Sequence, residues 1–259
     1  RDMMLSAAER GDVRELTRLL ANNADINETD YRGNSPLHCA AMFGFEGAVR
    51  LLLENNADTA ASTNAGFSPL HWTASKGHEG IVRLLLEKNA DMTASNKYGR
   101  SPLHLENNAD IAARDNVRVC ACGWRRECVA MGAALTAMFG HEGMVRLLLE
   151  NNADTAARDN GGSSPLHWAA KNGHEGVVRL LLDNKAEKEA KGLDDESPLH
   201  LAAMNDRTKV VKLLLDKHAD IAATDKAGRS SLHLAAENGH EGAVGLLLKK
   251  RANIGATDE

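Results

Sequence analysis

The sequence predicts an all-α solenoid of about eight helix-turn-helix units joined by β-hairpin-like finger loops. The first observation behind this prediction is a tetrapeptide, Ser-Pro-Leu-His, that returns at a fixed interval and is followed each time by a Leu-rich segment. Successive intervals between its histidines are 33, 33, 63, 33 and 33 residues. A fixed period of this size is typical of stacked supersecondary units. The tetrapeptide histidines, including that of a near-copy Ser-Ser-Leu-His, are His38, His71, His104, His167, His200 and His233.

The second observation is that one period contains the signals for two helices. In the copy that starts at Ser164, the serine is a suitable N-cap and Pro165 suits the first helical position, where a missing N–H costs nothing. Gly173 can end this short helix in the left-handed conformation. A second, Leu-rich helix is predicted to open at 174–176 and to continue through 177–182; its apolar residues cover more than one stripe, so we expect packing on several sides. A polar, turn-rich stretch then leads to the next copy.

The tetrapeptide, its period and its Leu-rich partner helix resemble the ankyrin repeat family, with Ser in place of the family's usual Thr. Five copies in register make the resemblance specific, and it covers nearly the whole chain. It implies a structural role for the tetrapeptide histidine, which bonds the turn and neighbouring backbone. It also implies that finger tips and first-helix surfaces together form a concave face that binds a partner.

We predict a single array over residues 1–259. Residues 1–33 form a degenerate, capping repeat, since Leu5 to Gly11 matches the first helix and Val13 to Leu20 the second. Residues 34–105 are regular repeats, 106–133 are an irregular segment that replaces part of repeats three and four, and 134–259 continue the repeats to an open C-terminal end. The final residues read like the start of another finger, so we expect a piece of a longer protein.

The irregular segment leaves three alternatives. Repeat three lacks a second helix and the foreign sequence is a surface loop, or that sequence supplies a substitute helix through Ala113, Val117 and Cys120. We favour the substitute helix because the total length is nearly conserved and because unburied apolar side chains cost about 1.5–3 kcal/mol each. A shifted reading frame or misjoined gene is the third alternative.

Composition excludes several functional classes. The formal charge is −5 and is mixed along the chain, which predicts neither a nucleic-acid footprint nor a basic membrane patch. No apolar run approaches the ~18 residues that would span a bilayer. Few cysteines and no signal-peptide pattern indicate an intracellular, cytoplasmic or nuclear, protein.

No sequence motif predicts catalysis, so we expect a protein that is not an enzyme and needs no cofactor. The histidines repeat at fixed places, which favours architecture over chemistry. Cys120, Cys122 and Cys128 invite a zinc interpretation, but their spacing does not suit a four-ligand site and no nearby histidine completes one. We therefore predict no metal.

Function is expected at positions that vary while their neighbours stay constant. At the finger tips these positions hold Tyr31, Arg32, Asn64, Lys97, Tyr98, Asn160, Leu193 and Lys226. The next variable position holds Asn34, Phe67, Arg100, Ser163, Glu196 and Arg229. The end of the first helix holds Met42, Phe43, Ser75, Lys76, Lys171 and Asn172. Aromatic residues and Arg, which are enriched in binding hot spots, gather in the N-terminal half.

The sequence thus predicts a monomeric scaffold that binds one or more partner proteins, mainly by apolar insertion and acidic complementarity on repeats one to three. The alternative interpretation of this surface is a solvated one with incidental aromatics. Trp72 and Trp168 are interpreted as packing residues, with a partly exposed contact as the alternative. Two other functions stay open: the recognition arm of a larger enzyme or channel, and a metal- or redox-sensing switch built on the three cysteines.

Overall fold

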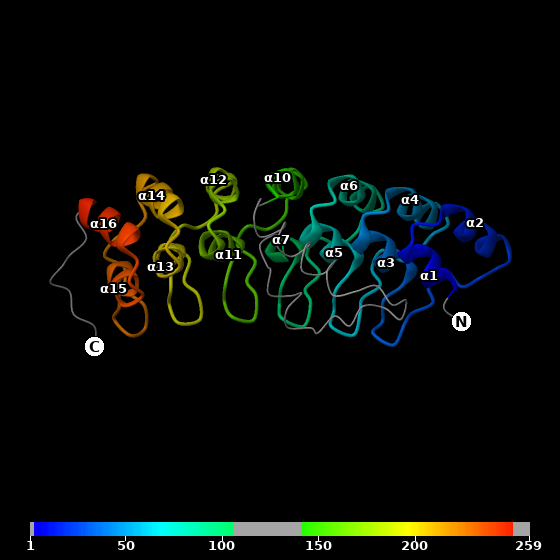
Figure 1. Ribbon diagram of the computed structural model, residues 1–259, viewed down its shortest axis with the longest axis horizontal. Helices are drawn as coiled ribbons and strands as arrows, with labels where there is room; N and C mark the ends of the chain where they lie inside the picture. Colours follow the sequence, from blue (N-terminus) through cyan, green and yellow to red (C-terminus); the bar gives the residue numbers. More distant parts are fainter. Residues whose placement is uncertain (1–2, 106–140, 251–259) are drawn as a thin grey trace. The chain divides into compact units, whose positions relative to one another are not determined.

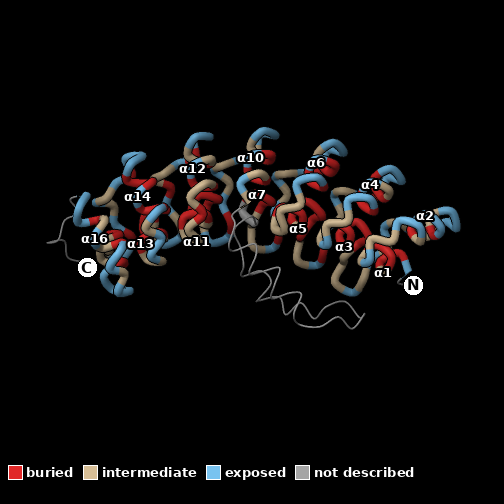
Figure 2. The backbone as a smooth tube through the Cα atoms, turned by 45° about the horizontal axis from the view of Figure 1, so that its top comes forward, coloured by how far each residue is buried: buried red, intermediate tan, exposed pale blue. Residues whose placement is uncertain are grey.

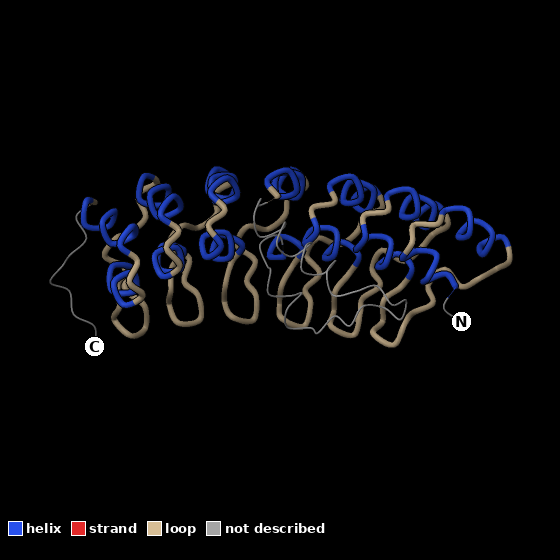
Figure 3. Tube along the Cα trace, in the orientation of Figure 1, coloured by secondary structure: helices blue, strands red, loops and turns tan. Residues whose placement is uncertain are grey.

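A computed structural model describes residues 3–105 and 141–250 (Figure 1). Within these ranges the regular secondary structure is helical, with one isolated β-bridge between Thr224 and Ser230 (Figure 3). The chain divides into two compact units, each described by itself. The first comprises Arg1–Glu106 with Gly143–Ala153, and the second Asn107–Glu142 with Asp154–Glu259.

The first unit stacks short helices in two layers. The first helices of its repeats are α1 (Met3–Glu9), α3 (Pro36–Phe43), α5 (Pro69–Lys76) and α7 (Pro102–Leu105), and each contacts the next. The second helices are α2 (Val13–Ala21), α4 (Glu46–Glu54), α6 (Glu79–Glu87) and α10 (Glu142–Glu150). The helices α1 and α2 lie where the sequence predicts the two helices of an opening repeat.

The second unit repeats the arrangement. Its first helices are α11 (Pro165–Asn172), α13 (Pro198–Met204) and α15 (Ser231–Glu237), and its second helices are α12 (Glu175–Asp183), α14 (Thr208–Asp216) and α16 (Glu241–Lys249). Each first helix packs on the second helix of its own repeat and on the first helix of the next. The predicted all-α stack of helix-turn-helix repeats is therefore confirmed.

The predicted boundaries of the first helix in the repeat of His167 are also confirmed. Ser164 is the N-cap of α11, Pro165 follows it, and Gly173 ends the helix with a φ of 84°. At the corresponding place in the repeat of His200, Asp206 takes a φ of 52°, a conformation that Asp tolerates better than most residues with a Cβ.

The core of each unit lies between its two layers (Figure 2). Its most regular members are second-helix leucines at one position of the period, all with no exposed surface: Leu52, Leu85, Leu148, Leu181, Leu214 and Leu247. Each buried leucine contributes about 1.5–3 kcal/mol relative to an exposed one. Buried alanines on the first helices, such as Ala40 and Ala74, let those helices approach closely.

The position of α10 bears on the middle of the chain. A Cβ added to Gly80, near the start of α6, would meet the carboxylate of Glu46 at the start of α4. A Cβ added to Gly143, near the start of α10, would meet Glu79 at the start of α6 in the same way. Hence α10 follows α6 as α6 follows α4, in the place of the second helix of the third repeat. The sequence prediction assigns α10 to a separate fourth repeat and a substitute helix to 106–133; residues 106–133 lie outside the described part of the chain.

This placement gives the 63-residue interval a simpler interpretation, because 63 is one period of 33 plus 30 residues. If Leu105 is joined directly to Thr136, the first helix of repeat three reads Ser-Pro-Leu-His-Leu-Thr-Ala-Met-Phe-Gly. Repeat one reads Ser-Pro-Leu-His-Cys-Ala-Ala-Met-Phe-Gly from Ser35 to Gly44, which is identical at 8 of the 10 positions. Residues 106–135 are then a 30-residue interruption of one repeat. The three cysteines and the residues expected to form a substitute helix lie outside the described part of the chain.

Candidate functional site

Fingers with Asp, Asn or Thr at the first position of the turn are held by that side chain, which accepts hydrogen bonds from backbone N–H groups of the turn. Oδ1 of Asp30 accepts the backbone N–H groups of Arg32 and Asn34, both at 2.8 Å. Asn96 binds the N–H groups of Tyr98 and Arg100 at 2.9 and 3.1 Å. Such side-chain bonds to the backbone favour turns over regular structure. They hold the variable finger-tip residues in a defined conformation.

The tetrapeptide histidine ties each finger to the helix before it. Nε2 of His38 donates to the carbonyl oxygen of Phe67 at 3.0 Å, while Nδ1 accepts from the N–H and hydroxyl of Ser35 at 3.1 and 2.8 Å. Because a carbonyl can only accept, the ring carries its hydrogen on Nε2. The structural role that the family resemblance implied is confirmed here and at His71, His167 and His200.

Burial explains why these histidines do not suit acid–base chemistry near neutral pH. Burial lowers the pKa of His38 and of His167 from 6.5 to about 4. It also lowers the pKa of His200. These rings are therefore neutral at pH 7, and both ring nitrogens are already committed to the fold.

Backbone hydrogen bonds also join neighbouring fingers within each unit. The N–H of Asn64 donates to the carbonyl of Arg32 at 2.8 Å, and that of Lys97 to Ala65 at 2.9 Å. In the second unit the N–H of Lys226 donates to Asp194 at 2.9 Å. Successive finger tips are thus held in register, which is what a preformed binding surface requires.

Most residues predicted to contact a partner lie at least partly on the surface. Those at the finger tips are mainly exposed, namely Tyr31, Asn64, Lys97, Asn160, Leu193 and Lys226. Half-buried residues of the fingers are Arg32, Asn34, Tyr98, Arg100, Ser163, Glu196 and Arg229. At the ends of first helices, Phe43 is exposed, and the half-buried residues are Met42, Ser75, Lys76, Lys171 and Asn172.

Phe67 is an exception, and its prediction as a partner-binding residue needs correction. Only 2% of Phe67 is exposed. Its ring stacks on Trp72 with centroids 5.1 Å apart and meets His71 edge-on at 5.8 Å. At the same position of the period the other finger residues are polar or charged, so the repeat pattern alone did not reveal that this side chain turns inward.

In the first unit, aromatic finger residues lie beside cations. The guanidinium of Arg32 lies 5.2 Å from the Tyr31 ring centroid. The Tyr98 ring has Lys97 at 4.9 Å and Arg100 at 5.6 Å. Such pairs present a flat apolar ring next to positive charge, which suits a partner with both apolar and acidic groups.

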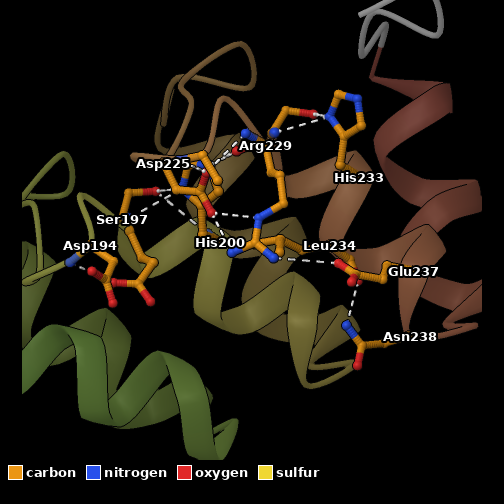
Figure 4. A network of polar contacts seen from close by, with 12 residues as sticks. Asp194, Ser197, His200, Asp225, Arg229, His233, Leu234, Glu237 and Asn238 are labelled. Atoms are coloured by element: carbon orange, nitrogen blue, oxygen red, sulfur yellow. Dashed lines mark hydrogen bonds and ion pairs between the residues drawn. The ribbon is translucent and has the colours of Figure 1, made fainter. Parts of the chain in front are cut away.

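In the second unit, a carboxylate neutralises the corresponding arginine (Figure 4). Arg229 pairs with Asp225 at 2.8 Å and with Glu237 at 3.6 Å. Burial by itself raises the pKa of Asp225, but the backbone N–H and guanidinium of Arg229 hold that pKa below its ordinary value. The position that Asp225 occupies here is occupied by Asn96 in the finger of Arg100.

The two tryptophans that follow a tetrapeptide histidine also differ between the units, because only the one in the second unit has a carboxylate partner. Nε1 of Trp168 donates to Asp159 at 3.0 Å. Nε1 of Trp72 is buried and has no acceptor. Both rings are half-buried, and no sequence pattern indicates that the N–H of Trp72 is unpaired.

The described residues offer no site for metal chemistry, since no group of three or more His, Cys, Asp or Glu side chains converges there. Among these residues, no helix is long and apolar enough to cross a membrane. The exposed positions that vary between repeats lie on the fingers and at the ends of the first helices.

Sequence comparison agrees with this architecture. The family described as ankyrin repeats (3 copies) matches residues 3–96, 130–192 and 188–258, and the single ankyrin repeat matches residues 98–160. The chain belongs to the ankyrin repeat family. The single-repeat match spans the interval that contains the interruption, as expected if one repeat is split there. Ankyrin repeats indicate a protein-interaction scaffold, typically a non-enzymatic one.

Among solved structures, the crystal structure of human ASB11 ankyrin repeat domain is similar, with a TM-score of 0.76 and 25% identity over 98% of this chain and 99% of that one. Two curated proteins match over short segments. The potassium channel GORK of Arabidopsis thaliana is 54% identical over 41 residues, and the potassium channel KOR1 of Oryza sativa subsp. japonica is 49% identical over 47. These segments are 16% and 18% of this chain and only 5% and 6% of the channels.

Proposed function

We propose that this protein is an interaction scaffold that binds a partner protein through its finger tips and the ends of its first helices. The principal observation is the contrast between constant and variable positions. Constant serines, histidines and finger carbonyls form one hydrogen-bond network, which orders the turns before any partner arrives. A preformed surface avoids part of the entropic cost of binding.

Within this surface, the first unit is the favoured binding region. Tyr31 is 78% exposed, and Tyr98 is half-buried among cations. Rigid, amphipathic tyrosines provide contact area at little entropic cost, and they are frequent hot-spot residues. We infer that apolar insertion beside acidic groups of the partner holds the complex together.

The test replaces Tyr31 and Tyr98 together by alanine, because Phe67 is buried and its replacement would report on folding. We expect the double variant to lose at least about tenfold in affinity for partners captured by the wild-type protein, since truncating a hot spot costs 2 kcal/mol or more. Affinity capture with quantitative mass spectrometry, followed by titration of the captured partner, measures this loss.

A matched control replaces Arg50 and Arg83, exposed residues of α4 and α6, by alanine. This control should bind as the wild type does. Equal binding by the tyrosine variant, with an unchanged circular dichroism spectrum, would contradict the proposed surface.

A second candidate is the recognition arm of a larger channel, which the short matches to two plant potassium channels favour. Those matches cover only 5% and 6% of the channels, so the rest of each channel has no counterpart in them. The complete open reading frame tests this candidate: pore-forming helices in the same frame would support it, and a frame without them would contradict it.

A further inference from the structure

The indole N–H of equivalent tryptophans is hydrogen-bonded in the second unit and unpaired in the first. Trp72 and Trp168 occupy the same position of the period, one residue after the tetrapeptide histidine. Eight residues before that histidine stands Asp159 in the second unit and Thr63 in the first. The carboxylate of Asp159 accepts the indole N–H of Trp168, whereas the hydroxyl of Thr63 accepts the backbone N–H of Phe67 at 3.1 Å. Trp72 is therefore left without the acceptor that its counterpart has.

An unpaired buried donor carries an energetic penalty, and each such group in a folded protein calls for a reason. The Trp72 ring is held by its stacking on buried Phe67, which limits its freedom to turn the N–H toward solvent. An indole N–H can only donate, so what is missing is an acceptor.

The surroundings of this donor are positively charged. Lys76 follows Trp72 by four residues on α5, so the two side chains lie on the same face of the helix. Lys76 is half-buried, and burial lowers its pKa, yet no ion pair to it occurs within residues 3–105 and 141–250.

We propose that the face of α5 formed by Trp72 and Lys76 is a subsite for an Asp or Glu side chain of a partner polypeptide, which accepts the indole N–H and pairs with the ammonium. The partner's carboxylate supplies in the first unit what Asp159 supplies internally in the second. The inference rests on the proposed function and adds to it the chemistry of one contact.

The geometry sets a condition on binding. Nε1 of Trp72 has essentially no exposed surface, so the carboxylate reaches it only after neighbouring side chains shift. Lys76 has a flexible stem on that face and can move with the ion that it binds. Once formed, the contact excludes water, and a charged hydrogen bond of this kind is stronger than one at the surface.

One substitution imitates the occupied subsite. In Thr63→Asp, a carboxylate stands where Asp159 stands in its own repeat. Aspartate suits this turn, because Oδ1 of Asp159 accepts the N–H groups of Gly161 and Ser163 at 3.0 and 2.9 Å. The new carboxylate should bond Trp72 internally and exclude the partner's acid.

The experiment selects peptides from a random twelve-residue display library on the wild-type protein. It then measures their affinity by fluorescence anisotropy for wild type, Thr63→Asp, Trp72→Phe and the control Trp168→Phe. We expect enriched peptides to contain Asp or Glu and to bind Thr63→Asp and Trp72→Phe about tenfold more weakly. Binding to Trp168→Phe should change less than twofold. Replacing the acidic residue of the peptide by Gln or Asn should weaken binding to wild type about tenfold and binding to Trp72→Phe by a smaller factor, since only the pair with Lys76 is then left to lose.

The outcomes separate this inference from the function on which it rests. Enriched peptides that bind Thr63→Asp and Trp72→Phe as tightly as wild type would overturn the carboxylate subsite and leave the scaffold function intact. A failure to enrich any peptide would count against both. Trp72→Phe keeps an aromatic ring against Phe67, so the test remains decisive if Thr63→Asp does not fold; thermal melts identify such a case.

Discussion

At the scale of single residues, side chains of the same kind have opposite roles in neighbouring repeats. Tyr98 lies at a finger tip between two cations, whereas Phe67 lies in the core against Trp72. Both were predicted to contact a partner because both break the repeat pattern. A residue that departs from the repeat pattern can point toward solvent or into the core. Which of the two it does depends on whether its neighbours offer apolar contact.

The buried histidines make stability depend on pH. The pKa of His38 and of His167 is about 4 in the folded protein, below the ordinary 6.5 of an unfolded chain. Between these values the unfolded state binds more protons, so stability falls as pH falls from 6.5 toward 4 and is flat above 6.5. We expect each ring to cost about 2 kcal/mol of unfolding free energy at pH 5 relative to pH 7.

Urea unfolding at the two pH values measures this change, and NMR titration of the ring protons assigns it to individual histidines. An unchanged unfolding free energy at pH 5, or ring titration near 6.5, would show that the histidines are not held neutral by the fold.

At the scale of elements, Asp225 both accepts the N–H groups of its finger turn and pairs with Arg229. One substitution separates these two contributions. In Asp225→Asn, the amide oxygen can still accept the turn N–H groups, as Asn96 does in its own finger. The ion pair to Arg229 is lost. We expect a destabilisation of about 1–2 kcal/mol, since the Asp225 side chain is 1% exposed but the guanidinium is partly solvated.

A double-mutant cycle with Arg229→Met measures the interaction by urea unfolding. If the ion pair contributes as expected, Asp225→Asn should cost much less in the Arg229→Met background. Equal costs in both backgrounds would assign the effect to the turn instead.

At the scale of the whole molecule, the main question is the 63-residue interval. In a repeat array each unit is stabilised by its neighbours, so an interruption inside one repeat weakens the coupling that crosses it. Since α10 already holds the place of the second helix of repeat three, residues 106–135 are not needed to fill that place.

We therefore expect deletion of residues 106–135, which joins Leu105 to Thr136, to yield a folded array with a higher melting temperature than wild type. The restored first helix recovers buried contacts on both sides, at roughly 1.5–3 kcal/mol per large apolar side chain. Thermal unfolding followed by circular dichroism measures the change. Deletion of residues 106–137, which removes two further residues and breaks the register, is the control and should be less stable. A melting temperature of the first deletion below that of wild type would show that the segment supports the array.

The sequence by itself determined the repeating helix pair, its capping serines and glycines, and the structural use of the histidines. These follow from local signals that recur with a period, because each repeat meets nearly the same neighbours. Only the tertiary structure decided the burial of Phe67, the unpaired N–H of Trp72 and the place of α10 beside α6. Each of these depends on contacts made where one repeat differs from the others, and the repeating pattern alone does not reveal such contacts.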